Sequence, residues 1–416
     1  MNPLAVAAVW AGTGIAGAAL LPPLRLRRLG VLVPLAGLAV VLTASLASAA
    51  VPGSTAPATL SLDRVSQGLV AAGAGSLVAT LLLAPSVEAA QLRTIGLAAA
   101  GVVVALASGN AIVWAVALVG SLCVLSLRWI ATTPGRATFT AGRVAVPGAA
   151  ALVAAAAFLP VTGVLTGARP VLASGLLASG IAAIAGLLPL GGWAIGALTN
   201  VAAADSAVWV VLLAPAVLLS ALRLEPVLPP LALVYFEGIL TVLGLASALW
   251  QGMIAHRLSG RARYVRVLLA DVALAATAIG TGHMAQALPA LLLLAVTHMT
   301  TSPLLLQEPD VRPRARPLMW LLLCGLPPGP SFWGRFAVLE ALSQSSFWGM
   351  VAAAVVMVLL FVAALVASLR RDDGRPAEPL RLRRLTDEGA AWTVFGGGLV
   401  AGLVPGAALT LIFGVR

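Results

Sequence analysis

Long apolar stretches, separated by short segments that carry charge, glycine or proline, follow one another along the whole chain. Most of them reach about 20 residues, which is enough for an α-helix to cross the ~30 Å hydrocarbon core of a bilayer. Dividing the chain at the interruptions predicts fourteen helices: 3–21, 29–50, 66–84, 94–108, 110–127, 144–167, 171–189, 205–222, 227–250, 266–282, 285–306, 317–342, 347–369 and 390–414. The pattern therefore predicts an all-α polytopic membrane protein, with one transmembrane domain over residues 1–416.

The composition supports this class and excludes a water-soluble globule. Hydrophobic residues make up 61% of the 416 residues and charged residues only 9%, whereas a soluble domain carries about 25% charged residues. The two cysteines, Cys123 and Cys324, lie in separate apolar segments, so neither a disulfide framework nor a metal site is predicted. The sequence contains no nucleotide-binding or zinc-binding motif, and we expect no cofactor in this chain.

The net charge of +11 does not indicate nucleic-acid binding, because the basic residues are spread over short loops. All 25 are arginines, and arginine-rich loops face the cytoplasm. With the N-terminus outside, 20 arginines fall on the cytoplasmic side, four fall outside, and Arg335 lies within a span. We therefore expect a bacterial inner-membrane protein with both termini on the outer side, a retained first span, and a cytoplasmic connector at 370–389.

The segment LCGLPPGPSFWGRF, 323–336, interrupts an apolar helix. Pro327, Pro328 and Pro330 remove backbone donors and leave carbonyls without intrahelical partners. A bilayer tolerates such a break only where protein or a wet cavity satisfies the freed groups. The sequence thus predicts discontinuous helices here and near 185–206, with Arg335 placed just beyond the first of these breaks.

Fourteen spans with a broken twelfth helix resemble the antiporter-like membrane subunits of respiratory complex I, Mrp antiporters and energy-converting hydrogenases. LCGLPPGPSFWGRF resembles the family's LaGlPPxxGFxGKF, THMTTSPLLL resembles HALFKALLF, RVLLAD resembles KRLLAY, and 187–224 resembles the run from PLHxWLPDA to APTPVSALL. The matching positions are Pro189, Leu190, Trp193, Ser206, Ala207, Arg223, Arg266, His298 and Arg335. The resemblance holds from about 180 to 345, and 1–143 is the least similar part.

This resemblance implies a proton half-channel and partner subunits in a membrane arm, yet the chain lacks most of the family's channel residues. The family's fifth-helix glutamate falls near Leu118. Its lysines in the seventh and eighth helices, and the lysine that follows the histidine, align with Ile184, Pro215 and Ser302. Only His298 and Arg335 remain of the central chain, and arginine stays charged where a buried lysine can release its proton. The path is therefore expected to be impaired or partial.

Intramembrane ionisable residues are functional candidates by default, but each has a structural alternative. Arg335 is a candidate for the proton path or a cation that caps the broken helix and pairs with an acid, such as Glu340 or one from a partner. His298 lies beside threonines and either carries protons or forms structural hydrogen bonds. Glu237 and Glu340 are further intramembrane acids, each a candidate for a remnant of the proton path with a structural role as the alternative.

The remaining acids have simpler interpretations. Asp205 begins the eighth span and is expected to be a helix N-cap, with a place on the proton path as the alternative. Asp271 is expected to join the arginines of 257–266 in a cytoplasmic surface cluster.

Three functions remain open. The chain is a membrane-arm subunit of a redox-driven, proton-translocating assembly, a degenerate scaffold in a related hydrogenase, formate-oxidising or inorganic-carbon-uptake complex, or a stand-alone cation/proton antiporter. The missing carboxylate and lysines count against the third. The expected partners are other membrane subunits, lipid, and protons or cations, with no nucleic acid.

Overall fold

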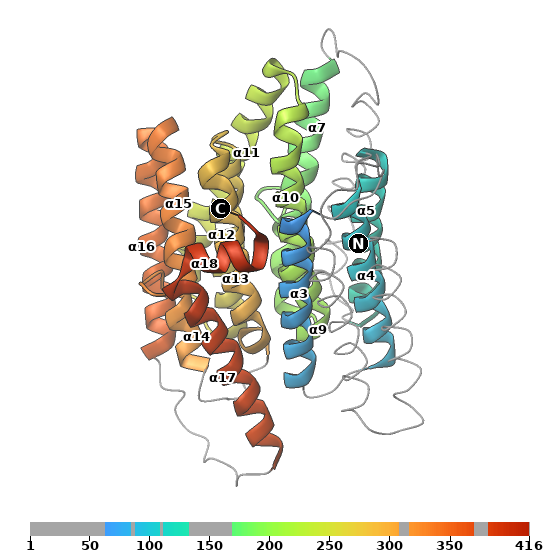
Figure 1. Ribbon diagram of the computed structural model, residues 1–416, viewed down its shortest axis with the longest axis vertical. Coiled ribbons are helices and arrows are strands. Elements are labelled where there is room, and N and C mark those ends of the chain that lie inside the picture. The colour runs from blue at the N-terminus through green and yellow to red at the C-terminus, as the bar shows by residue number, and fades with distance from the viewer. Residues whose placement is uncertain are drawn as a thin grey trace.

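A computed structural model describes residues 63–84, 88–108, 111–132, 169–307, 316–369 and 382–415. The described elements are helices, most of which run roughly along the long axis of the molecule (Figure 1). The predicted spans 3–21, 29–50 and 144–167 lie outside the described residues. Each of the eleven other predicted spans contains a helix.

The helices follow the predicted order. The long ones are α3 (Arg64–Leu83), α4 (Ala89–Ala107), α5 (Ala111–Thr132), α11 (Pro230–Ala255), α12 (Gly260–Ile279), α13 (Met284–Leu305), α16 (Phe347–Leu369) and α17 (Leu382–Leu403). The shorter pieces are α7 (Arg169–Ile184), α8 (Gly192–Asn200), α9 (Ala203–Val208), the π-helical turn η1 (Trp209–Leu213), α10 (Ala214–Leu224), the 3-10 turn η2 (Glu225–Val227), α14 (Arg316–Leu323), α15 (Pro330–Ser345), α18 (Pro405–Ala408) and the π-helical turn η3 (Leu409–Phe413). Several helix ends differ from the predicted ones by five residues or more, as for α4, α5, α7, α11, α12 and α17.

Within the described part of the chain, seven helices are long and apolar enough to cross a membrane, or eight if the bent pair at the C-terminal end counts as one span. The other predicted spans fall short for physical reasons. The α7 helix is only 16 residues long, α12 carries several charges near its start, and the 317–342 span is split into α14 and α15. The total of fourteen spans stays a prediction.

Two predicted breaks are present. The chain leaves α7 at Ile184 and resumes helix at Gly192, and it leaves α14 at Leu323 and resumes at Pro330. In the first break Gly186 has φ +78°, a conformation that glycine adopts without strain. We call these the α7–α8 break and the α14–α15 break.

The last predicted span, 390–414, is not a straight helix. α17 ends at Leu403, and the helical segment that begins at Pro405 is bent from it by 110°. A residue before proline is pushed out of the helical region, and Val404 has φ −131° and ψ 67°. α17 begins at Leu382, so the predicted connector 370–389 ends as helix; its residues 370–381 lie outside the described part.

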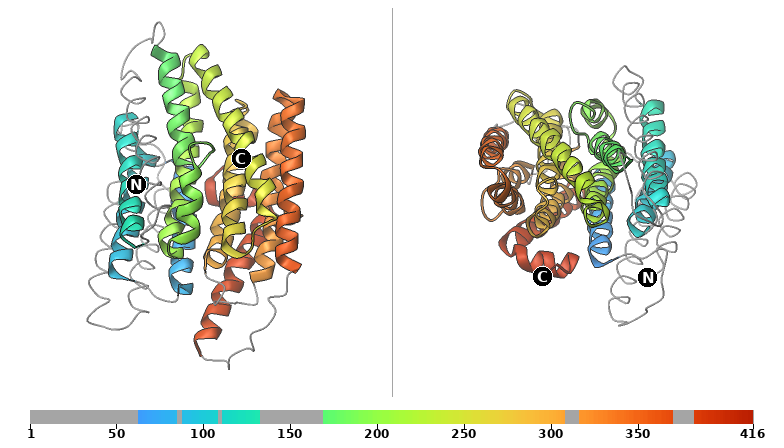
Figure 2. Two further views of the ribbon diagram at one scale, coloured as in Figure 1. Left: turned by 180° about the vertical axis from the view of Figure 1, so that it is seen from behind. Right: turned by 90° about the horizontal axis from the view of Figure 1, so that it is seen from above.

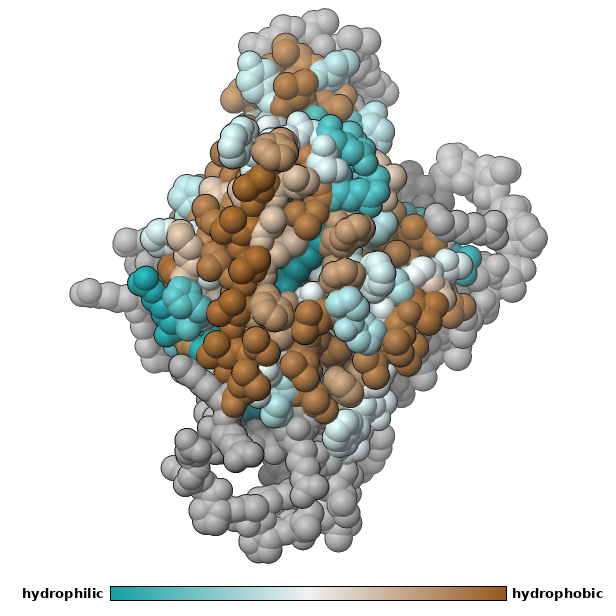
Figure 3. Space-filling model, turned by 90° about the vertical axis from the view of Figure 1, so that its left-hand side faces the viewer, coloured by the Kyte–Doolittle hydropathy of each residue, from teal (hydrophilic) through white to brown (hydrophobic). Residues whose placement is uncertain are grey.

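The centre of the bundle is formed by the α9–η1–α10 span and by α13. Most of Ala203–Leu224 (89%) is buried, but only 28% of α16. Figure 2 shows α16 at one edge of the bundle and α4 and α5 toward the other. On the face where α15 and α16 lie, apolar residues cover much of the described surface (Figure 3). The exposed valines of α16 include Val355, Val358 and Val362, as expected for a surface that faces lipid.

The described arginines near helix ends divide unequally between the two ends of the bundle. Arg128 is near the end of α5, Arg261 at the start of α12 and Arg316 at the start of α14; we call this the arginine-rich end. Arg64 starts α3 and Arg223 is near the end of α10, at the opposite end. The division matches the predicted asymmetry, and the side of the membrane that each end faces stays a prediction.

Candidate functional site

The α14–α15 break is held together by side chains. The hydroxyl of Ser331, in the first turn of α15, donates to the Leu322 carbonyl, which the break has freed. Gly325 has φ +77°, and a Cβ at this position would lie 2.7 Å from an Arg335 terminal nitrogen, Nη1. Only glycine therefore allows the chain to turn here and Arg335 to pack against the turn.

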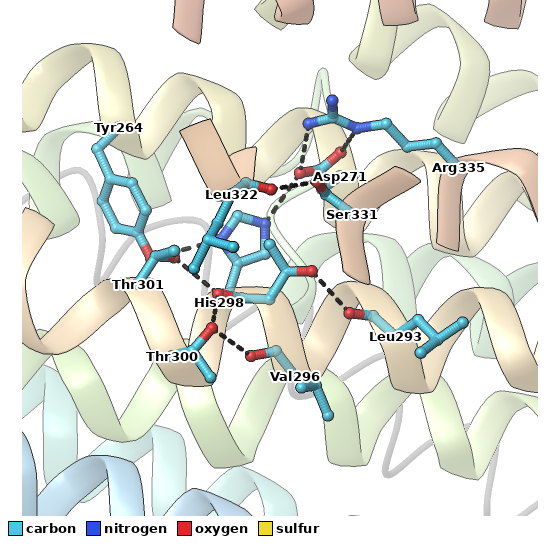
Figure 4. A network of polar contacts seen from close by, with 11 residues as sticks. Tyr264, Asp271, Leu293, Val296, His298, Thr300, Thr301, Leu322, Ser331 and Arg335 are labelled. Carbon is cyan, nitrogen blue, oxygen red and sulfur yellow. Dashed lines mark hydrogen bonds and ion pairs between the residues drawn. The ribbon is translucent and has the colours of Figure 1, made fainter. Parts of the chain in front are cut away.

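Arg335 donates to Asp271 rather than to the carbonyls of the break. Its Nε lies 2.9 Å from Asp271 Oδ1, and its Nη2 lies 3.0 Å from Oδ2, so the pair is bidentate (Figure 4). The Asp271 side chain is fully buried and the Arg335 side chain is 3% exposed. A fork-shaped guanidinium matches a carboxylate in this geometry, and the pairing avoids leaving a single charge in the interior.

His298, on α13, joins the same carboxylate. Its Nε2 lies 3.1 Å from Asp271 Oδ2, and its Nδ1 lies 3.4 Å from the Tyr264 hydroxyl. A neutral imidazole with its proton on Nε2 would donate to Asp271 and accept from Tyr264, which satisfies both nitrogens. A protonated imidazole would instead require the tyrosine oxygen to accept. We call Tyr264, Asp271, His298 and Arg335 the polar centre.

Local sequence explains how three helices meet at this point. Tyr264 and Asp271 are seven residues apart on α12, which places them on one helix face two turns apart. The Thr297 and Thr301 hydroxyls bond to carbonyls one turn earlier in α13. Thr301 and Ser302, on the same helix, also interact with the Tyr264 hydroxyl, so α13 contributes more than His298 to this cluster.

The prediction that Asp271 joins a surface cluster is wrong. It lies in the third turn of α12, inside an apolar run, and is fully buried. Arg263, another expected member of that cluster, is also buried and donates to the carbonyls of Leu258 and Ala363. The sequence did contain a signal, since an acid inside an apolar span is a functional candidate.

Glu340 is not the partner of Arg335. It is exposed and accepts a weak hydrogen bond of 3.5 Å from Gln286, near the start of α13. Glu237 also lies away from the polar centre: it is on α11 beside Gly282, in the turn between α12 and α13. Of the predicted site residues, His298 and Arg335 are brought together, whereas Glu237, Glu340 and Asp205 are not.

Asp205 is not a helix N-cap. The cap of α9 is Ala202, and Asp205 lies in the first turn. Its side chain is fully buried, and Oδ2 is 3.5 Å from Arg128 Nε. An acid in the first turn still complements the helix dipole, but its environment is one ion pair at the arginine-rich end rather than an exposed cap.

Of the positions where the family carries channel residues, three are apolar here, and the fourth, Ser302, interacts with Tyr264 of the polar centre. Leu118 and Ile184 are buried, and Pro215 is in the first turn of α10. Ser302 is 3.4 Å from the Ser76 hydroxyl.

Three tryptophans fill the space around the α7–α8 break. The indole of Trp209 donates to the Ile184 carbonyl at 3.1 Å, and that of Trp193 donates to the Ala183 carbonyl at 2.9 Å. Trp129 packs against Trp193 with ring centroids 5.9 Å apart, and Trp193 against Trp209 at 6.3 Å. The three rings, which we call the tryptophan cluster, are at most 2% exposed. The freed carbonyls of this break are thus satisfied by groups that cannot titrate.

No group of three or more histidine, cysteine, aspartate or glutamate residues that could hold a metal ion occurs among the described residues. The expectation of no cofactor stays a prediction.

Comparison with known proteins gives a structural match without a sequence match. No family model matches the chain, and no curated protein matches it. A chain of respiratory complex I from Thermus thermophilus superimposes with a TM-score of 0.78 at 21% identity, over 99% of each chain. A chain of an archaeal membrane-bound sulfane sulfur reductase gives 0.79 at 14% identity, over 98% of this chain and 78% of the other.

A chain of the Mrp complex from Dietzia sp. gives a TM-score of 0.78 at 17% identity, over 99% of this chain and 51% of the other. The TM-scores establish a shared fold at low sequence identity, which agrees with the resemblance drawn from the motifs. The chain has the fold of the antiporter-like membrane subunits of complex I and its relatives.

Proposed function

We propose that this chain is a membrane-arm subunit of a complex-I-like assembly, with a proton path that is interrupted at the tryptophan cluster and of which the polar centre is a remnant. The observation that carries the proposal is the contrast between the two breaks. The α14–α15 break faces a buried Asp271–Arg335 pair with His298, while the α7–α8 break is closed by indoles.

A continuous path would require titratable or hydrated groups across the ~30 Å hydrocarbon core. Between Asp205 and Arg223, the span through the centre of the bundle has no ionisable side chain. The polar centre contains ionisable groups, but the span through the centre of the bundle has such groups only at its two ends, Asp205 and Arg223. We therefore infer that the chain contributes a local proton site rather than a complete channel.

The degenerate scaffold remains the second candidate, and the bidentate pair favours it. Asp271 and Arg335 join α12 to α15 in the interior, which is a structural role that requires no proton movement. The stand-alone antiporter is disfavoured, because the span through the centre of the bundle carries no ionisable side chain between Asp205 and Arg223.

Two measurements test the proposal. A tagged chain extracted in mild detergent should copurify with other membrane subunits in fixed stoichiometry; recovery of the chain alone would contradict the assembly. The second measurement uses Asp271→Leu with Arg335→Met, which removes the ion pair without leaving a buried charge. If the polar centre takes part in proton movement, the reconstituted double variant assembles but translocates fewer protons per electron.

The matched control for the double variant is Arg223→Gln. Arg223 also binds across helices, to Asp63 and to the Leu106 carbonyl. Its side chain is partly exposed and lies at the end of the bundle opposite the arginine-rich end. Arg223→Gln should lower stability without changing the number of protons per electron. If the double variant and this control both keep the wild-type stoichiometry, the chain is a scaffold.

A further inference from the structure

Arg128, near the end of α5, is shared by two carboxylates. Its Nη2 lies 2.6 Å from Glu88 Oε2, and its Nε lies 3.5 Å from Asp205 Oδ2. The side chains are 66%, 13% and 0% exposed in the order Glu88, Arg128, Asp205. Arg128 therefore connects an exposed carboxylate at the arginine-rich end to a fully buried one.

Asp205 is poorly satisfied for a buried carboxylate. The polar side chains that face the carboxylate are Arg128, whose Nε is 3.5 Å away, and Gln91. Among the described residues, neither carboxylate oxygen accepts a hydrogen bond of normal geometry. The position itself is fixed, because the Trp129 indole lies 3.4 Å from the Asp205 carbonyl. Buried polar atoms without partners are rare and call for an explanation, and an ionised oxygen of this kind is costly.

The other charged groups around Asp205 face away from it or reach the solvent. Glu88 caps α4, and the Gln91 side chain, one turn along that helix, faces Asp205. Arg261 of α12 donates instead to the Leu198 carbonyl and to the Ser206 hydroxyl. The described charges of α3 lie at its opposite end, and His298, on α13, belongs to the polar centre.

The route inward from Asp205 is closed. Trp129 follows Arg128 in the chain and stacks on Trp193, which in turn meets Trp209. From Ser206 onward the buried span carries no ionisable side chain before Arg223, at the other end. On the outer side, Asp205 is connected through Arg128 to Glu88, which is 66% exposed; on the inner side, its own span offers no ionisable group before Arg223.

We propose that Asp205 is a one-sided proton-binding site, which takes a proton from water at the arginine-rich end and returns it to the same end. In the transfer, hydronium or a buffer acid gives its proton to Asp205 Oδ2, an O–H bond forms, and Arg128 pairs with Glu88 alone. Reversal releases the proton past Arg128. For its role the site rests on the proposed function, in which it is the closed remainder of an interrupted path.

The first test is infrared difference spectroscopy of the full-length protein in lipid nanodiscs, with isotope-labelled aspartate, between acidic and mildly alkaline pH. A buried carboxylic-acid band that appears on acidification should be lost in Asp205→Asn. Asp63→Asn is the matched control, because Asp63 also pairs with an arginine, Arg223, but is 55% exposed at the opposite end. A band that persists in Asp205→Asn, or disappears in the control, would overturn the proposal.

The second test does not depend on the asparagine variant folding. Asp205→Cys is placed in a background with Cys123→Ser and Cys324→Ser and treated with a membrane-impermeant thiol reagent from each side. Labelling should occur from the arginine-rich end only, and become several-fold faster when Arg128→Ala is added. Labelling from the opposite end would reveal a continuous path, and labelling from neither end would show that water does not reach the site; both results would contradict the inference.

These outcomes are separable from those of the proposed function. If the chain purifies without partners yet shows the Asp205 band, the proposed assembly is contradicted and the proton-binding site is supported. If the chain copurifies with partners and the band is absent, the assembly is supported and the site is contradicted.

Discussion

The two broken helices solve the same problem with different chemistry. Each break frees carbonyls inside the bundle. At the α7–α8 break the indoles of Trp193 and Trp209 donate to these carbonyls, and an indole only donates. At the α14–α15 break the freed carbonyl of Leu322 takes a hydroxyl from Ser331, and Arg335 remains available for Asp271. The comparison teaches that one scaffold can keep a broken helix while gaining or losing ionisable chemistry beside it.

The largest effect on stability should come from breaking the Asp271–Arg335 ion pair beside the α14–α15 break. Asp271→Asn leaves Arg335 as a buried cation without its counterion, which costs about 3–5 kcal/mol when one partner of a buried pair is removed. Asp271→Leu with Arg335→Met should recover most of this loss, since well-packed apolar residues replace such pairs without penalty. Thermal unfolding in detergent measures the cycle. A double variant as unstable as Asp271→Asn would show that packing, not charge, is responsible.

A pH-dependent effect should come from Glu225, which follows α10 in the turn η2. Burial, and then the charge of Glu237, raise the pKa of Glu225 from 4.5 to about 7. Below pH 4.5 both folded and unfolded chains are protonated there; as the pH rises to about 7, the unfolded chain ionises first and stability falls.

The fall should amount to at most about 3 kcal/mol from a shift of this size. Glu225→Gln should abolish it, because an amide does not titrate. Melting temperatures at acidic and neutral pH, compared with those of the exposed control Glu340→Gln, measure the difference. An unchanged pH dependence of the melting temperature in Glu225→Gln would show that Glu225 is not the group responsible.

The turn of the α14–α15 break can be tested through Gly325. Gly325→Ala places a Cβ in a backbone with φ +77° and within 2.7 Å of Arg335 Nη1, so it should cost about 1–3 kcal/mol. Gly175→Ala, on α7, meets nothing within 4 Å and should be neutral or stabilising by up to about 1 kcal/mol. Equal melting temperatures for the two variants would mean that Arg335 does not depend on this turn.

Much of the fold follows from the sequence, because apolar length and proline positions are direct physical requirements of a bilayer. These grounds predict the two breaks and the order of the described helices, whereas several helix ends differ from the predicted ones by five residues or more. The bend before Pro405 was missed, since the proline was read as part of an apolar run, although the restriction on Val404 is local and could have been used.

The polar centre was only half predicted. His298 and Arg335 were identified, but their common partner was not, because Asp271 is 64 residues from Arg335 in sequence and short-range patterns do not report such contacts. Asp205 was assigned to a cap from its position near a helix start. Only the packing of α4 and α5 against α9 shows that its partner is Arg128.

The smallest effect on stability should come from the tryptophan cluster at the α7–α8 break. Trp209→Phe keeps most of the ring but removes the indole donor, so the Ile184 carbonyl loses its 3.1 Å hydrogen bond. Leaving one buried acceptor unsatisfied costs about 1–2 kcal/mol. Trp114→Phe is the matched control: Trp114 is also buried, and its indole nitrogen has no hydrogen-bond partner among the described residues, so only the change in ring size is measured.

Thermal unfolding of both variants gives the net effect of the lost hydrogen bond as their difference. If Trp209→Phe is no less stable than Trp114→Phe, the indole does not satisfy the break. The tryptophan cluster would then act by volume alone, and the contrast between the two breaks would rest on the polar centre.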